Sequence, residues 1–542
     1  MGKQIARDLP QPQMEDLGDY EEDDRSRKNS LPESSRKELS KELAMGSPRS
    51  IFQTCVPRTD VLAGTTKDEQ FAADLAQVIK GTAPDEYQVP STFFSHSYPT
   101  RGMRELLKAV CKRISGQGGE VSSVLRLETQ FGGGKTHGLI AVVHTVRGAE
   151  GVGNIGDFVD PSLLPNGKVQ VAAFDGENSD PANGLTLEGD LRAYSLWGDL
   201  AYQLAGVEGY RRVETSDRRH IAPGAETIRE LFGGEPALIL IDEIAPYLRK
   251  VERASPGASD QLAPFLQGLI KAVVSSPRVA LVFTLAVGKD SHASDAYKEE
   301  TERALKAFAE AESVAARKFT VLNPTEEDET AAVLRRRLFE SVDNTGADEA
   351  LAAYSEVWTR NAASLPGGII TPELKELFRR GYPLHPETLA LLTEKTSTLT
   401  NFHRIRGMVR LLTRTAHLLW RDKPADSYAI HPHHIDPGYG PIRDEFTTRL
   451  GMGEFAPALK ADIAAVPGDD PSEAQKLDLK YYPGGLPISS YVARTIFLNT
   501  LAYTDAAKGV SPEHLRFSVC SPSVEPAFIE QARLRPPDLG PG

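Results

Sequence analysis

The sequence predicts an α/β fold built on a doubly wound parallel sheet, followed by a domain of helices. Short β-prone runs alternate with helical patterns from residue 119 to 323, as in parallel sheets whose strands are joined by crossover helices. One run, at 237–241, is apolar throughout, which is typical of a strand buried on both faces. From Pro324 onward only helical patterns follow.

The elements are predicted from the spacing of apolar residues. Helices with one apolar face are expected first, at 68–79 and 100–114. The strands of the sheet are expected at 121–127, 169–174, 237–241, 278–285 and 318–322. Their helices are expected at 135–147, 196–204, 225–232, 261–275 and 295–311. After the last strand, helices with no strand among them are expected at 326–339, 372–380, 386–396 and 402–420, and a further helix at 489–502.

These elements divide the chain into five regions. Residues 1–48 are polar, charged and poor in aromatic side chains, so they are predicted to form a disordered arm. The other regions are a helical segment at 49–118, the α/β core at 119–323, a helical lid domain at 324–425, and a partly helical C-terminal region with a disordered tail at 426–542.

Composition narrows the classes of function. The chain has 542 residues and a net charge of −13, so it lacks the overall basic character of many nucleic-acid-binding proteins. Its three cysteines, Cys55, Cys111 and Cys520, are far apart in sequence, which argues against a disulfide framework or a cysteine metal site. No signal peptide or membrane-spanning segment is evident. We therefore expect a cytoplasmic protein without a membrane partner.

A glycine-rich segment after the first predicted strand indicates a phosphate-binding loop. Its three consecutive glycines are Gly132, Gly133 and Gly134. Glycines allow backbone N–H groups to surround phosphate oxygens, Lys135 would reach the β- and γ-phosphates of ATP, and the Thr136 hydroxyl would bind Mg²⁺. The complete motif has glycine where this chain has Thr129. The alternative is a glycine-rich turn that precedes an ordinary helix.

Two acids follow the buried run at 237–241. The carboxyl end of a parallel strand is where open α/β sheets bind ligands. Asp242 would hold the Mg²⁺ shell, and Glu243 would orient and deprotonate the attacking water. The pair favours ATP hydrolysis over kinase chemistry, because an acceptor other than water would not need the second acid. The alternative is a core strand whose acids only begin the next helix.

With these motifs in order, the chain resembles AAA+ ATPases, and within them the DUF499 family of prokaryotic ATP-binding proteins. The matching phrases are PRTDVLAGTTKDEQFAADLAQVIKGTAPDEY (57–87), FGGGKTH (131–137), LWGDLAYQLAG (196–206), ALILIDEIAPYLRKV (237–251), VLRRRLFE (333–340), YPLHPETLALL (382–392) and FHRIRGMVRLL (402–412). The resemblance implies a P-loop NTPase (AAA+-like) sheet with a helical lid. It also implies that the family's C-terminal region is lacking here, and an association of some relatives with genome-defence gene clusters.

The resemblance suggests roles for further residues. Thr284, at the end of the fourth strand, would sense the γ-phosphate, and its alternative is a threonine favoured by β-structure. Arg317 would be the arginine finger that reaches a neighbouring subunit's nucleotide, with Arg303 as a second candidate. The alternative for Arg317 is a surface ion pair. His137 would touch phosphate or, as the favoured alternative, pack at the helix start.

A row of arginines lies within 404–421. The resemblance to AAA+ ATPases implies that one of them, Arg406 or Arg404, contacts the nucleotide from the lid. The spacing of Arg406, Arg410 and Arg414 places them along one helical face. Two alternatives are open for the row, a stripe that binds DNA phosphates and a set of solvated or internally paired arginines.

The function expected from the sequence is that of a Mg²⁺-dependent ATPase whose hydrolysis of ATP changes the conformation of a partner. A homo-oligomer and a protein partner are both left open. Two alternatives stand beside it: a nucleotide-dependent switch or scaffold that hydrolyses ATP slowly, and a DNA-engaging ATPase or loader.

Overall fold

The computed structural model describes residues 48–64, 73–117, 121–129, 134–149, 151–286, 297–315, 319–396, 399, 402, 404–501 and 509–534. Nearly all of the predicted arm at 1–48 lies outside these residues, as does the predicted tail from 535.

A five-stranded parallel sheet forms the centre of the α/β half, as the sequence predicts. Its strands, in their order across the sheet, are β3 (Gln170–Asp175), β6 (Ala237–Asp242), β7 (Val279–Ala286), β2 (Val124–Thr129) and β8 (Thr320–Leu322). The first strand starts at Val124 and not at 121, because the Ser122 hydroxyl binds both the N–H and the C=O of Val124 in a local turn.

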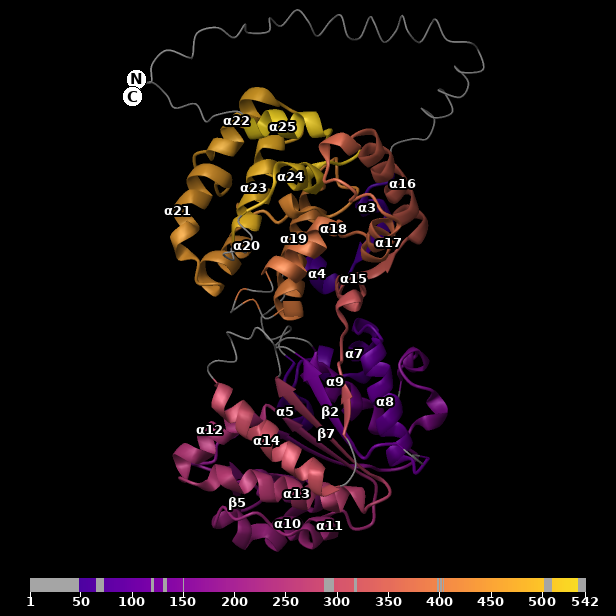
Figure 1. Ribbon diagram of the computed structural model, residues 1–542, viewed down its shortest axis with the longest axis vertical. Coiled ribbons are helices and arrows are strands. Elements are labelled where there is room, and N and C mark those ends of the chain that lie inside the picture. Colours follow the sequence, from indigo (N-terminus) through magenta and orange to yellow (C-terminus); the bar gives the residue numbers. More distant parts are fainter. Residues whose placement is uncertain are drawn as a thin grey trace, which may run out of the picture. The chain divides into compact units, whose positions relative to one another are not determined.

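Each face of this sheet has its own core. Along β6, Leu238 and Leu240 belong to one core, and Ile239 and Ile241 to the other. The first core includes helices α5 (Leu75–Lys80), α7 (Pro90–His96), α8 (Arg101–Ile114) and α9 (Lys135–Val146). The second includes α10 (Leu196–Arg218), α11 (Ala225–Leu231), α12 (Ile244–Ala254), α13 (Leu262–Val274) and α14 (Lys298–Ala315). Figure 1 shows the sheet between α8 and α9 on one side and α13 and α14 on the other, so helices cover both faces.

Helix α10 is longer than the predicted 196–204. Ala205 and Gly206 interrupt its helical geometry, and Gly206 has a positive φ of 63°. The sequence pattern stops at this kink, and the second part of α10 continues to Arg218. That part is fixed by Asp217, whose carboxylate accepts hydrogen bonds from the backbone N–H groups of Tyr194 and Ser195.

The chain from residue 324 is mainly helical. Its helices are α15 (Thr330–Leu338), α16 (Asn344–Arg360), α17 (Pro372–Gly381), α18 (Pro386–Ala390), α19 (Arg404–Asp422), α20 (Gly440–Asp444), α21 (Ala456–Ala458), α22 (Glu473–Tyr481), α23 (Ile488–Leu501), α24 (Pro512–Val519) and α25 (Pro526–Leu534). The expectation that no strand occurs among the first of these helices is wrong. Strand β9 (Phe339–Val342) follows α15 and pairs antiparallel with β1 (Cys55–Pro57). A partner so distant in the sequence leaves no periodic signal.

The segment at 49–118 divides its packing between the two halves of the chain. Helices α3 (Ile51–Thr54) and α4 (Thr59–Ala63) lie beside β1, and Ile51, Cys55 and Val61 are buried in the core of the helical half. Residues 75–114, with α6 (Asp85–Gln88), pack instead in the core on one face of the sheet.

All three cysteines are buried and unpaired. No helix in the described part of the chain is long and apolar enough to cross a membrane.

Four buried histidines lie together in the helical half. The ring of His431 stacks on that of His385 at 4.3 Å and on that of His433 at 5.0 Å, and His434 lies 4.4 Å from His433. The far face of His433 stacks on Tyr491 at 3.9 Å. Burial lowers the pKa of His431 to about 4 and holds the pKa values of the other three rings well below their usual range. The rings are therefore neutral in the folded chain.

We expect this cluster to make the helical half sensitive to acid. Below the ordinary histidine pKa of about 6.5, these histidines bind protons in the unfolded chain but stay neutral in the folded chain. The free energy of unfolding therefore falls as pH falls from about 6.5 toward 4. Each ring should contribute a loss of about 1.4 kcal/mol per pH unit in that range. Denaturant unfolding at several pH values measures this slope. A His433→Phe variant, which keeps the stack but removes one titrating ring, should show a shallower slope than the wild type, and equal slopes would contradict the expectation.

Candidate functional site

The register of the sheet brings the predicted site residues to one edge. Asp175 of β3 pairs with Asp242 of β6, Ile241 pairs with Phe283 of β7, and Leu127 of β2 pairs with Thr284. Asp175, Asp242 and Thr284 are consequently level with one another at the carboxyl ends of neighbouring strands, beside the strand that precedes the glycine segment. This is the edge at which open parallel sheets bind ligands.

The glycine segment is described only from its last residue. Gly132 and Gly133 lie outside the described residues. Gly134 has a φ of +85° and forms the N-cap of α9, so its conformation favours glycine. Lys135 and Thr136 occupy the first turn of α9, where free backbone N–H groups and the helix dipole favour an anion.

Asp242 is held from both sides by the two predicted threonines. The Thr136 hydroxyl donates a hydrogen bond to Asp242 Oδ2 at 2.8 Å, and the Thr284 hydroxyl donates one to Oδ1. Thr284 and Asp242 are both buried. The structure thus brings together three residues from separate elements. The alternative prediction for Thr284 was a threonine present only because β-structure favours it. Its hydrogen bond to Asp242 is a specific contact that this alternative does not require.

Glu243 adopts a strained backbone conformation next to Asp242. Its φ of +50° and ψ of +50° lie in the left-handed region, which is unusual for a residue other than glycine, asparagine or aspartate. Gly176 permits this arrangement, because a Cβ at that position would lie 2.0 Å from the carbonyl oxygen of Glu243. The conformation turns the chain from β6 into α12 and leaves the Glu243 side chain among the pocket residues.

The charges at this edge are buried together. Burial, followed by the Asp242 carboxylate, raises the pKa of Glu243 to about 7, while the ammonium group of Lys135 opposes the shift. Lys135 is only 6% exposed, and burial lowers its pKa while Glu243 and Asp242 oppose that change. Lys135 therefore favours the charged form of Glu243, and the two carboxylates favour the charged form of Lys135.

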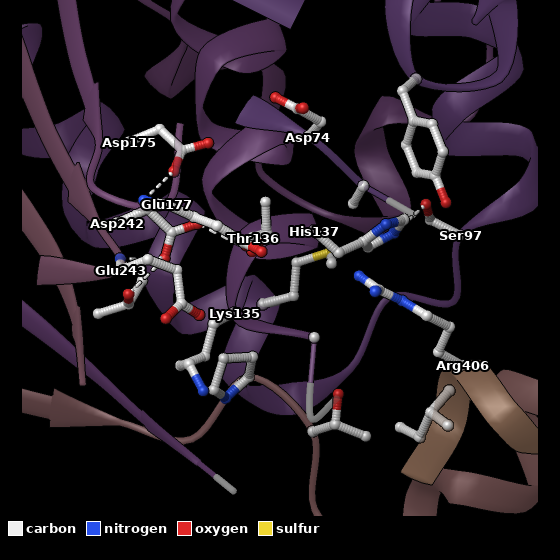
Figure 2. A pocket seen from close by; sticks show the side chains of 18 of the residues that line it. Asp74, Ser97, Lys135, Thr136, His137, Asp175, Glu177, Asp242, Glu243 and Arg406 are labelled. Atoms are coloured by element: carbon white, nitrogen blue, oxygen red, sulfur yellow. Dashed lines mark hydrogen bonds between the residues drawn. The ribbon is translucent and has the colours of Figure 1, made fainter. Parts of the chain in front are cut away.

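These residues line a cavity of about 550 Å³. Figure 2 shows Asp242, Glu243 and Asp175 on one side of it, and Ser97 and Arg406 on the other, with His137 between them. Sequence reasoning missed the lining acids Asp175 and Glu177. Asp175 follows the second strand as Asp242 follows the third, and this repeated position was the available signal. Burial and Asp242 raise the pKa of Asp175.

His137 lies in the wall of the cavity in a packed arrangement. Its ring centroid is 4.4 Å from that of Phe93, and its Nε2 is 2.8 Å from the Ser97 hydroxyl. Because that hydroxyl donates to the carbonyl of Phe93 at 2.7 Å, Nε2–H of His137 is the donor to Ser97. Burial lowers the pKa of His137 to about 4, so the ring is neutral.

The arginine row divides into two groups. Arg406 is exposed and lines the cavity (Figure 2). Arg410 is 2% exposed and donates from Nε to both oxygens of Glu445 at 2.7 and 2.8 Å. Arg414 also pairs with Glu445 and donates to the carbonyl of Pro441 at 2.9 Å. Internal ion pairs, one of the predicted alternatives, therefore account for Arg410 and Arg414.

Of the three other predicted arginines, the structure describes the side chain of Arg303. Arg317 and the side chain of Arg404 lie outside the described residues. Arg303 donates to the Ser259 hydroxyl at 3.0 Å and is not among the cavity's lining residues.

The fold and the site define an α/β protein with a cavity at the carboxyl edge of a parallel sheet. The chain belongs to the DUF499 family. The DUF499 N-terminal domain matches residues 52–315, and the DUF499 second domain matches residues 325–541. No curated protein and no solved structure matches the chain.

Proposed function

We propose that the chain is a P-loop ATPase of the AAA+ type, which binds ATP with Mg²⁺ and uses hydrolysis to change the conformation of a protein partner. The observation that carries this proposal is the Thr136–Asp242–Thr284 arrangement beside the buried cation of Lys135, in one cavity at the carboxyl edge of the sheet. A phosphate chain would give the Lys135 ammonium group anionic partners in addition to Asp242 and Glu243.

The residues present fit a nucleotide and its metal. The cavity is within the usual size range for small-molecule sites. No group of three or more His, Cys, Asp or Glu residues in the described ranges could hold a metal ion. Thr136 and Asp242 supply two adjacent oxygen donors, which suits Mg²⁺, an ion that is commonly bound by one or two side chains together with phosphate oxygens. When bound, Mg²⁺ would neutralise charge on the phosphates.

The proposed roles of the protein groups follow from their positions. Lys135 would contact the β- and γ-phosphates, and the backbone of Gly134 would approach them at the start of α9. Glu243 would accept the proton of the attacking water, and a pKa near neutral suits a base that works at neutral pH. Thr284 donates its proton to Asp242, so its supported role is to orient that carboxylate.

The helical half is the part of the chain that we expect to change conformation when ATP is hydrolysed. Arg406, Ile405 and Val409 of α19 line the same cavity as Lys135, so a nucleotide in the cavity would contact α19. The buried Arg410–Glu445 pair joins α19 to the helices that follow it. Hydrolysis would change how the bound nucleotide contacts α19, and the helical half would respond as one packed unit.

Steady-state phosphate release by the purified chain, measured with and without DNA, tests the proposal. We expect hydrolysis that requires Mg²⁺ and does not change when DNA is added, because Arg410 and Arg414 are bound to Glu445 and cannot act as a free basic stripe. ATP binding without turnover would support the switch or scaffold. Stimulation by DNA that weakens with salt would support the DNA-engaging ATPase.

A further inference from the structure

Besides Asp175, Asp242 and Glu243, a second set of polar residues lines the cavity. Glu86, His96 and Arg337 are all lining residues. His96 precedes Ser97, which Figure 2 shows on the side opposite Asp242 and Glu243. Arg337 is near enough to His137 to contribute to its lowered pKa. Arg337 and Arg406 both act electrostatically on Tyr87, and Figure 2 shows Arg406 on the side opposite Asp242 and Glu243. Because Glu86 and His96 both contact Arg337, we assign the three residues to that side of the cavity.

The contacts among these residues determine which of their polar atoms have no partner. Arg337 Nη1 donates to His96 Nδ1 at 3.3 Å and to Asp60 Oδ2 at 3.5 Å, and Nη2 pairs with Glu86 Oε1. Since arginine can only donate, His96 Nδ1 is an acceptor and the ring proton is on Nε2. Within the described residues, Glu86 Oε2 and His96 Nε2 have no hydrogen-bond partner. Two residues that line the cavity thus each keep one polar atom for a ligand, an acceptor on Glu86 and a donor on His96.

The surroundings of this donor and acceptor suit a flat ring. Apolar side chains from three helices line the same cavity: Phe93, Val333, Ile405 and Val409. The Glu86 and Arg337 side chains are only 12% and 14% exposed, so their ion pair has a fixed geometry in the wall. An apolar slot with a few placed polar groups is the usual form of a site that selects one ring among similar ones.

We propose that Glu86 Oε2 and His96 Nε2 select the base of the bound nucleotide, Glu86 by accepting from the 6-amino group of adenine and His96 by donating to the adjacent ring nitrogen. This inference rests on the proposed function. Hypoxanthine, the base of inosine triphosphate, reverses both groups: it carries an oxygen in place of the amino group and a protonated ring nitrogen. The wall should therefore favour ATP over inosine triphosphate.

The test measures the binding of ATP, inosine triphosphate and inorganic tripolyphosphate, each with Mg²⁺, to the full chain. The wild type should bind ATP at least about 10-fold more tightly than inosine triphosphate, the effect expected from one or two hydrogen bonds to polar or charged groups. In Glu86→Gln the amide oxygen should stay toward Arg337, which places the NH₂ group where Oε2 was. ATP should then bind roughly 10-fold more weakly, inosine triphosphate more tightly, and tripolyphosphate as before.

Asp60→Asn is the matched control. It weakens the other ion pair of Arg337, but Asp60 does not line the cavity, so the ratio of ATP to inosine triphosphate affinity should keep its wild-type value. The inference would be overturned if the wild type bound ATP and inosine triphosphate equally well, or if a folded Glu86→Gln chain kept the wild-type ratio of the two affinities. Binding of tripolyphosphate would in either case still support the phosphate site. If the wild type binds neither tripolyphosphate nor ATP, the proposed function itself fails.

Discussion

Replacing Lys135 by alanine should abolish ATP binding and leave the chain folded. The lysine is buried at the start of α9, and the Glu243 and Asp242 carboxylates favour its charged form. Without its charge the phosphates would meet Asp242 and Glu243 with no cation beside them among the described lining residues on that side. Loss of a buried charged partner costs on the order of 2–5 kcal/mol, so affinity should fall by about 30-fold to several thousand-fold.

Nucleotide titration of the variant measures this effect, and thermal unfolding shows whether the fold is kept. Lys135→Met, which retains most of the side chain's volume without its charge, should lose affinity to a similar extent, because charge and not packing is responsible. Lys271→Ala, on the exposed face of α13, is the control and should bind ATP as the wild type does. Unchanged affinity in Lys135→Ala would remove the phosphate site from this cavity.

The part of the site that could be predicted is the part encoded by local patterns. Asp242 and Glu243 follow a continuous buried run, and Lys135 and Thr136 follow the glycines, so each could be assigned to the end of a strand or the start of a helix. The parallel register then brings them together. Their roles toward ATP stay predictions, but their positions at one edge follow from the alternation of strands and helices alone.

The remaining features depend on contacts between distant segments. Gly176 is needed only because the carbonyl of Glu243 approaches it, and Arg410 is buried only because Glu445 lies opposite. The pairing of β9 with β1 is of the same kind. A glycine after a strand, or an arginine on an amphipathic helix, has many ordinary explanations until the partner is known. The arginine row was therefore ambiguous in the sequence, and the structure separates Arg406 from its neighbours.

The Glu243→Gln substitution should keep ATP bound and stop its hydrolysis. Burial and the Asp242 carboxylate already disfavour the charged form of Glu243, so a neutral amide of the same shape should relieve repulsion and leave affinity unchanged or higher. The amide cannot accept the proton of the attacking water. Loss of a general base typically lowers the rate by about 10²–10⁴-fold.

Single-turnover hydrolysis and equilibrium binding, measured on the same preparation, separate these two effects. Glu208→Gln changes an exposed acid on α10 and should retain the wild-type rate. A strained residue can also matter through its backbone, and Glu243→Gln preserves length and shape, so a loss of rate with intact binding points to the carboxylate itself. If the variant hydrolyses ATP as fast as the wild type, Glu243 is not the base, and Asp175, the other cavity acid whose pKa is raised, becomes the next residue to test.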